Sequence, residues 1–337
     1  MTDTDQRVKA FRADADRLRA AVAEMIVGQD QVVEEVLMCL FAGGHALLEG
    51  APGLGKTLLV RTLAQTMELR FSRIQFTPDL MPGDIVGTNI VVEDENGRKR
   101  FELAKGPIFG QLVLADEINR ATPKTQSALL EAMGETSVTI AGTVHALDEP
   151  FFVLATENPI EMEGTYPLPE AQLDRFLFKV IVPQPDEETL IEILERTTGT
   201  RVADVPRVVD GPRLLEMRAL VREVHVAAAL TRWVAQLVRR SDPSHPDSAP
   251  SAQRLLRYGA GVRGGQSILL AAKVHALMNG KAHVSFADLE RVAHPALRHR
   301  LIPSFEAEAD GVDTDAILER LLAEVPRPSD RVEAIAG

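Results

Sequence analysis

Residues 50–57 read Gly-Ala-Pro-Gly-Leu-Gly-Lys-Thr, a glycine-rich loop that ends in Gly-Lys-Thr. Residues 45–49 before it predict a buried strand, and residues 58–67 after it predict a helix. Glycines allow the backbone to curl until its N–H groups face a phosphate group, and the helix directs its positive end at the same anion. An ordinary glycine-rich turn is the alternative, but it does not explain the full motif spacing in this context. The stretch therefore predicts a phosphate-binding loop for a nucleoside triphosphate.

The side chains of this loop predict an ATP–magnesium site. Lys56 supplies a positive charge for the β- and γ-phosphates, and Thr57 offers a hydroxyl ligand to Mg²⁺. Val27 and Gly28 interrupt the preceding helical pattern, and we also place them at the nucleotide. The residues expected to bind ATP are Gly50, Ala51, Pro52, Gly53, Leu54, Gly55, Lys56, Thr57 and Leu58, together with Val27 and Gly28.

A second motif, residues 112–117, is an apolar run that ends in the carboxylates of Asp116 and Glu117. Asp116 is expected to reach Mg²⁺, and Glu117 is the candidate that polarises the attacking water. Asn158 follows another predicted strand, residues 151–155, where an amide can orient the water and contact the γ-phosphate. The alternatives are a pair of solvated acids at a strand end and a turn-forming asparagine before a proline.

Two arginines are candidates for stabilising charge on the phosphates. Arg175 lies in residues 169–176, roughly a hundred residues or more after the phosphate loop. We therefore expect it to act on the γ-phosphate bound by a neighbouring subunit. A surface ion pair with Asp174 or Glu170 is the alternative. Arg263 opens an apolar helix, from which a cation could fold back onto the nucleotide; an exposed loop arginine is the alternative.

Composition limits the class of protein. The chain has 337 residues, 45% of them hydrophobic, which suggests two or three domains with a full core. Lys plus Arg is 37 and Asp plus Glu is 49, a net charge of −12, which disfavours a dedicated nucleic-acid binder without excluding a small basic pore. Its one cysteine, Cys39, is expected to be a buried, inert thiol in a reducing cytoplasm. We expect no membrane span, since no run of 18 apolar residues occurs.

The first part of the chain predicts an α/β fold. Short apolar strands at 45–49, 71–76, 112–115, 151–155 and 176–182 alternate with helices, which is typical of a five-stranded parallel sheet covered on both faces. Two β-hairpin inserts are predicted, at 88–102 around Asn96-Gly97 and at 137–147 around Ala141-Gly142.

The sequence Pro183-Gln184-Pro185 marks a predicted boundary between a nucleotide-binding domain, residues 1–183, and a helical lid domain, residues 184–337. No convincing strand follows, so the lid is predicted to be all-helical. A segment rich in proline and serine, residues 241–251, predicts a mobile loop. The predicted helices of the lid are 186–197, 212–240, 265–279, 286–298 and 313–324.

The order of these motifs resembles an AAA+ ATPase, and the finer match is to the MoxR family. It is carried, over nearly the whole chain, by residues 50–57, 106–109, 114–121, 124–133, 155–159 and 169–176. The resemblance implies that 88–102 is the helix-2 insert and 137–147 the pre-sensor-1 insert. It also implies that Asn158 is sensor 1, Arg175 the arginine finger and Arg263 sensor 2. Family members assemble as hexameric rings and remodel client proteins, often with partners that bear a von Willebrand factor A domain.

One departure from the family weakens one of these roles. The family usually has Gly-Ala-Ser-Pro-Arg where this chain has Gly259-Ala260-Gly261-Val262-Arg263, so the stiffer turn before Arg263 is missing. Arg120, beside the Asp-Glu pair, is the second candidate for an arginine that acts between subunits.

Three other functions remain open. A magnesium-chelatase-like motor would share every motif and differ only in its partner. A nucleic-acid translocase would need basic hairpin tips, whereas the first tip mixes acidic and basic residues and the second has no Lys or Arg. A scaffold that binds ATP without hydrolysing it is disfavoured by the presence of Glu117.

Overall fold

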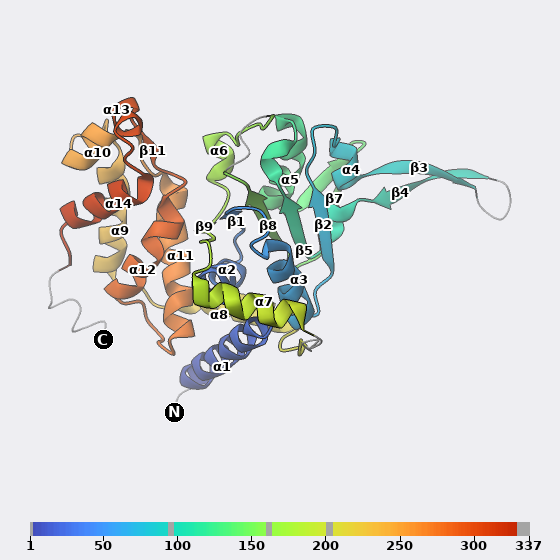
Figure 1. Ribbon diagram of the computed structural model, residues 1–337, viewed down its shortest axis with the longest axis horizontal. Coiled ribbons are helices and arrows are strands. Elements are labelled where there is room, and N and C mark those ends of the chain that lie inside the picture. Colours follow the sequence, from blue (N-terminus) through green and yellow to red (C-terminus); the bar gives the residue numbers. More distant parts are fainter. Residues whose placement is uncertain (1–2, 94–97, 160–163, 200–204, 329–337) are drawn as a thin grey trace.

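A computed structural model of the chain describes residues 3–93, 98–159, 164–199 and 205–328. Its centre is a parallel five-stranded sheet in the order β2-β5-β8-β1-β9 (Figure 1). This confirms the predicted α/β fold class. The strands are β1 (Ala46–Glu49), β2 (Phe71–Gln75), β5 (Leu112–Asp116), β8 (Phe152–Glu157) and β9 (Phe178–Ile181).

Both faces of the sheet are buried, which explains why its strands are apolar without alternation. In β5, Leu112 and Leu114 belong to one apolar cluster, whereas Val113 and Ala115 belong to a second cluster across the sheet. Successive side chains of a strand point to opposite faces, so a strand covered on both sides needs an apolar residue at every position.

Helices cover the two faces. In the first cluster, α1 packs against α2 and α3; on the other side α4 packs against α5.

Cys39 lies in α2 and is fully buried, and burial raises the pKa of its thiol well above the ordinary value, in agreement with an inert thiol. The elements are α1 (Asp3–Ala23), α2 (Asp30–Ala42), α3 (Lys56–Thr66), α4 (Pro82–Val86), α5 (Pro123–Glu135), α6 (Glu170–Leu173) and the 3₁₀ turns η1 (Pro107–Phe109) and η2 (Ile118–Arg120).

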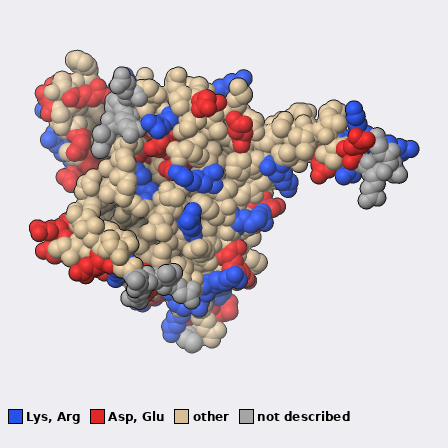
Figure 2. Space-filling view, turned by 45° about the vertical axis from the view of Figure 1, so that its right-hand side comes forward, with Lys and Arg blue, Asp and Glu red and all other residues tan. Residues whose placement is uncertain are grey.

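Two antiparallel hairpins are attached to this core. The first, β3 (Gly87–Glu93) with β4 (Lys99–Lys105), extends beyond the predicted 88–102 and projects far from the body (Figures 1 and 2). Its predicted Asn-Gly turn lies outside the described residues. The second pairs β6 (Ser137–Ile140) with β7 (Thr143–Ala146), and Ala141 and Gly142 both have positive φ, as a two-residue hairpin turn requires.

The C-terminal part is mainly helical but corrects three predictions. The predicted helix 212–240 is two helices, because the chain breaks around His225, whose carbonyl accepts a hydrogen bond from Val284 N at 3.1 Å. The lid is not all-helical, since β10 (Leu256–Tyr258) pairs with β11 (Ile302–Pro303). The helices are α7 (Glu187–Thr198), α8 (Gly211–Glu223), α9 (Ala228–Ser241), α10 (Pro250–Leu255), α11 (Val262–Met278), α12 (Phe286–Leu297), α13 (Phe305–Ala309) and α14 (Thr314–Glu324).

The third correction concerns the segment 241–251, predicted to be a loop too polar to pack. Ser248, Ala249 and Ser251 are buried there, and Ser251 Oγ donates to Glu324 of α14 at 2.8 Å. Short polar side chains pack when a neighbouring element supplies the hydrogen-bond partner.

The lid shares its core with the nucleotide-binding part. Helix α11 packs on α1 and α2, and α8 packs on α2, within one apolar cluster. The boundary at residue 183 stays a prediction, although the chain leaves β9 at Ile181 and enters α7 at Glu187. Among the described residues, no helix combines the length and the apolar character that crossing a lipid bilayer requires.

Candidate nucleotide site

The phosphate-binding loop connects β1 to α3. Gly53 and Gly55 have φ of +80° and +75°, and a Cβ on either would meet no atom within 4 Å. Conformation rather than space therefore requires glycine at these two positions. Lys56 opens α3, and its Nζ donates to the carbonyl oxygens of Gly50 at 2.5 Å and Ala51 at 3.3 Å. Burial lowers the pKa of Lys56, and Asp116, Glu117 and Glu49 oppose that shift.

Asp116 ends β5 and has hydrogen-bond donors on both carboxylate oxygens. Thr156 Oγ1, on the neighbouring β8, donates to its Oδ1 at 2.7 Å. Arg73, on β2, donates to its Oδ2 through Nη2 at 2.7 Å and through Nε at 3.2 Å. Two neighbouring strands thus orient the carboxylate that we expect at the metal.

Glu117 follows directly and has an unusual backbone, with φ +56° and ψ +52°. This left-handed conformation costs about 1 kcal/mol or more for a residue with a side chain, and such outliers cluster at functional sites. The backbone N–H of Glu117 donates to Thr156 Oγ1 at 2.9 Å. Its Oε2 accepts from Gln75 Nε2 at 2.9 Å and from Arg120 Nη1 at 3.1 Å. Arg120, the second candidate for a between-subunit arginine, therefore contacts Glu117 of its own chain.

These groups meet at one edge of the sheet because β5, β8 and β1 are neighbours. Asn158 follows β8 and is buried, and the N–H of Gly50 donates to the carbonyl of Glu157 at 3.3 Å. The carboxyl ends of parallel strands form the ligand-binding edge of an open α/β sheet. The phosphate loop, both carboxylates and the amide therefore face the same space.

A cavity of about 680 Å³ lies beside the loop, and its size suits a nucleotide. Val27, Gly28, Leu58, Pro52, Gly53, Leu54 and Gly55 line it, all of them residues that we predicted to contact ATP; that contact stays a prediction. A Cβ on Gly28 would lie 2.2 Å from Thr189 Cγ2, so this glycine permits the approach of α7. Helix α7, which the motifs did not place at this site, also lines the cavity with Thr189, Leu190 and Ile193.

Arg175 and Arg263 lie elsewhere. Arg175 precedes β9, next to Leu177, whose N–H donates to His45 at the start of β1. This is the amino edge of the sheet, whereas the phosphate loop follows the carboxyl end of β1. Arg175 Nη1 donates to the carbonyl of Leu130 at 2.5 Å. Arg263 Nη1 lies 3.7 Å from Asp174 Oδ2, so the structure does not bring it to the phosphate loop of its own chain.

Comparisons with known proteins agree with this geometry. The pattern of the ATPase family associated with various cellular activities (AAA) matches residues 45–178, and that of the AAA lid domain matches residues 249–321. Chaperone MoxR1 of Mycobacterium tuberculosis is 41% identical over 323 residues, which cover 95% of this chain and 85% of that protein. The chain belongs to the MoxR family of AAA+ ATPases. It is therefore an ATP hydrolase.

Two further matches extend over almost the whole length of both chains. Protein MoxR of Paracoccus denitrificans is 29% identical and covers 96% of this chain and 99% of its own. The crystal structure of a putative ATPase from Cytophaga hutchinsonii superimposes with a TM-score of 0.88 at 39% identity, over 96% of this chain and 98% of that chain. Both matches therefore include the sheet and the C-terminal helices of this chain.

Three residues of this MoxR-family site were not found from the sequence: Arg73, Gln75 and Thr156. Each contacts Asp116 or Glu117 from a neighbouring strand. A weak signal existed for Thr156, which directly follows the predicted strand 151–155. No signal distinguished Arg73 or Gln75 from solvent-facing strand residues.

Proposed function

We propose that this MoxR-family ATPase, as a cytoplasmic homo-hexameric ring, hydrolyses ATP with Mg²⁺ and uses the energy to remodel or activate a protein client. The observation that supports the hydrolytic part best is the convergence of the phosphate loop, Asp116, Glu117 and Asn158 on three adjacent strand ends. Chaperone MoxR1, the relative with 41% identity, supports the remodelling part.

The donor set at this edge fits Mg²⁺. The Thr57 hydroxyl and the Asp116 carboxylate are oxygen ligands, which this hard cation prefers. When bound, the ion neutralises charge on the phosphates. Among the described residues no group of three or more His, Cys, Asp or Glu side chains forms a separate metal site, so these residues would hold the ion together with phosphate oxygens.

The proposed chemistry divides between neighbouring side chains. Lys56 opens α3, and we expect it and the loop N–H groups to hold the β- and γ-phosphates, because a helix N-terminus and a lysine charge both favour an anion. Glu117 accepts a hydrogen bond from the attacking water, and Gln75 and Arg120 fix the carboxylate that does so. Asn158 orients the same water from β8.

The position of Arg175 supports an assembly of several subunits. It lies at the amino edge of the sheet, and a strand rises only about 3.3 Å per residue, so the whole length of β1 separates Arg175 from its own phosphate loop. A neighbouring subunit that sets this edge against its own nucleotide would receive Arg175 as a cation for the transition state. The resemblance to the family supports a ring of six.

The first hairpin is the proposed contact with the client. Val91 and Phe101 lie opposite each other on one face of the ribbon, and are 58% and 78% exposed. An isolated two-stranded ribbon is only marginally stable in water, so apolar side chains this exposed suit binding of another protein. The end of the hairpin carries both Lys/Arg and Asp/Glu side chains (Figure 2), which suits a protein better than a nucleic acid.

The decisive experiment is affinity capture from native lysate with ATP-loaded Glu117→Gln as bait. Lys56→Ala, which should not bind nucleotide, is the matched control, and mass spectrometry with nucleic-acid staining is the readout. We expect a protein with a metal-binding von Willebrand factor A domain, lost with Lys56→Ala and with Phe101→Ser. Nucleic acid in place of protein would support the translocase, and subunits of a chelatase would support the motor. Native mass spectrometry of the bait tests the ring of six.

A further inference from the structure

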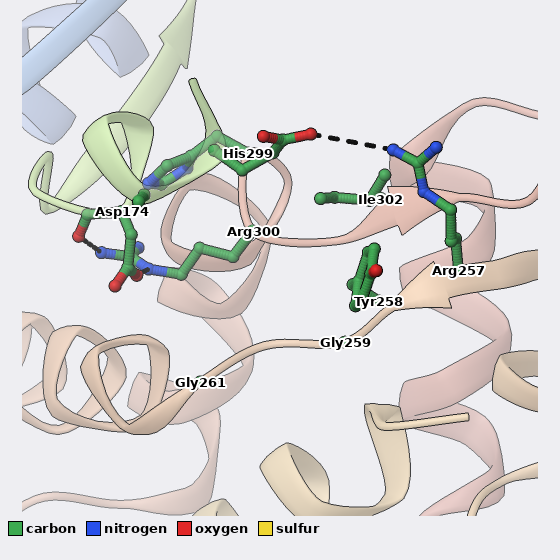
Figure 3. Close-up of a pocket in the computed structure, with 10 residues that line it drawn as sticks. Asp174, Arg257, Tyr258, Gly259, Gly261, His299, Arg300 and Ile302 are labelled. Carbon is green, nitrogen blue, oxygen red and sulfur yellow. Dashed lines mark hydrogen bonds and ion pairs between the residues drawn. The ribbon is translucent and has the colours of Figure 1, made fainter. Parts of the chain in front are cut away.

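The lid is fastened to the amino edge of the sheet by a buried arginine, Arg300, which follows α12. Its side chain is only 3% exposed, although it lies in the wall of a cleft between α6 and the lid (Figure 3). A buried guanidinium must have its donors satisfied, and all three nitrogen atoms of Arg300 have acceptors.

Most of those acceptors lie on the residues that flank Arg175 in the sequence. Arg300 Nε donates to Asp174 Oδ1 at 2.7 Å, and Nη2 donates to the carbonyls of Asp174 at 2.9 Å and Phe176 at 2.7 Å. Nη1 donates to the carbonyl of Leu177 at 3.2 Å and, within the lid, to that of Ala296. The guanidinium thus holds the backbone on both sides of Arg175 without contacting Arg175 itself.

Two further residues of the lid contact the same segment, residues 174–177. His299 Nε2 donates to the carbonyl of Phe176 at 3.1 Å, and Arg263 lies 3.7 Å from the second oxygen of Asp174. Figure 3 shows Arg300 directed at Asp174 with His299 beside it. Three side chains of the lid therefore contact the segment before β9.

We propose that Arg300 is a positioning residue that places Arg175 for reaction at the neighbouring subunit's nucleotide and ties that reaction to the position of the lid. The proposal rests on the proposed role of Arg175. A displacement of about 1 Å at a reacting group can cost about 100-fold in rate, so a cation presented across a subunit boundary needs a rigid base. Arginine suits this because its planar fork reaches several acceptors at once, whereas lysine is a single point charge.

Arg298 provides a matched control two residues away. Its side chain is 11% exposed, it pairs with Asp315 at 2.9 Å, and its Nη1 donates to the carbonyl of Lys179 at 3.2 Å. It therefore also joins the lid to β9, but beyond the segment that holds Arg175. A general loosening of the lid should follow from Arg298→Lys as much as from Arg300→Lys.

The test compares Arg300→Lys, Asp174→Asn and Arg298→Lys in the full chain, by steady-state ATP hydrolysis and by binding of a fluorescent ATP analogue. Arg300→Lys should bind the analogue within about twofold of the wild type but lower kcat about tenfold or more. Arg298→Lys should lower kcat by less than about threefold. Asp174→Asn keeps the carbonyl acceptors and should resemble Arg300→Lys, which covers the case in which that variant folds poorly.

A double-mutant cycle decides whether Arg300 acts through Arg175. In an Arg175→Ala background, Arg300→Lys should lower the residual hydrolysis no further. Mixing Arg300→Lys with Lys56→Ala subunits, whose Arg175 is intact, should restore part of the lost activity. Additive losses in the cycle, equal effects of Arg298→Lys and Arg300→Lys, or no recovery in mixtures would each overturn the proposal. If Arg175→Ala itself retains normal hydrolysis, the proposed role of Arg175 fails first.

Discussion

Two arginine–aspartate pairs at opposite edges of the same sheet differ most in the exposure of the arginine. Arg73 and Asp116 lie 2.7 Å apart at the carboxyl edge, and Arg300 and Asp174 lie 2.7 Å apart at the amino edge. The side chain of Arg73 is 46% exposed, whereas that of Arg300 is 3% exposed. The two pairs thus have the same N···O distance but differ in how far water reaches the arginine. That difference in solvent access decides how easily each pair can separate.

In the first pair water competes for the guanidinium of Arg73, although Asp116 is only 12% exposed, so the pair is weakened from one side. In the second pair the arginine is buried, and loss of its partner would leave a charge without solvent. Arg73 can leave Asp116 when another cation arrives, so that pair suits a carboxylate that takes part in a reaction cycle. Arg300 has no such freedom, because four backbone carbonyls hold it as well as Asp174. The Arg300–Asp174 pair therefore suits a permanent contact between the lid and the sheet.

The largest expected effect is on stability. Arg300→Met should lower the free energy of unfolding by about 3 kcal/mol, the low end of the range for a broken buried pair, because Asp174 remains 31% exposed. Arg73→Met should lower it by less, about 1 kcal/mol, because the Arg73 side chain is 46% exposed and Thr156 Oγ1 still donates to Asp116. Urea denaturation of both variants measures the difference, and similar losses would remove the distinction between the two pairs.

The second effect locates the chemistry at the carboxyl edge. Glu117→Gln should bind ATP normally and hydrolyse it at least about 100-fold more slowly, which corresponds to about 2.7 kcal/mol, because an amide cannot accept the proton of the attacking water. Single-turnover hydrolysis and analogue binding check this. Normal turnover would mean that another group acts as the base.

The third effect concerns pH and His45, which precedes β1. His45 Nδ1 accepts from Val153 N at 3.0 Å and Nε2 donates to the Met133 carbonyl at 3.2 Å, so the neutral ring is satisfied. Burial lowers the pKa of His45 to about 4, below its ordinary value of about 6.5. The unfolded chain then binds a proton first as the pH falls from 6.5 towards 4, so stability is present above 6.5 and is lost below it.

At pH 5 this histidine should cost about 2 kcal/mol of stability. Urea denaturation of the wild type and of His45→Gln, each at pH 7.5 and pH 5, isolates its share, since the other titrating groups are common to both. His299, which lies at the same amino edge and bonds to Phe176, also has a pKa lowered well below 6.5 by burial and should keep part of the pH dependence in the variant. An unchanged pH dependence in His45→Gln would exclude this assignment.

The smallest expected effect tests whether Mg²⁺ displaces Arg73 from Asp116. Arg73→Ala should lower the Mg²⁺ concentration needed for half-maximal binding of an ATP analogue by up to about fivefold, the equivalent of an exposed pair worth at most about 1 kcal/mol. Titration of Mg²⁺ at fixed nucleotide measures it. A higher Mg²⁺ requirement would instead indicate that Arg73 contacts the phosphates.

The sequence by itself determined the parts of the molecule that depend on local pattern. The loop around Lys56 and Thr57, the apolar strands and both hairpins could be predicted, because glycine spacing and continuous apolar runs follow from backbone geometry and from burial on two faces. Asp116 and Glu117 could also be placed, since a polar residue at the end of a buried strand lies at the ligand-binding edge.

Only the tertiary structure decided which side chains meet over long separations. Arg300 contacts Asp174 across 126 residues of sequence, and Arg73 contacts Asp116 across 43. It also decided the break at His225 and the pairing of β10 with β11, where partners far along the chain supply the hydrogen bonds. Local propensity carries no information about such partners, because their choice depends on how the whole chain packs.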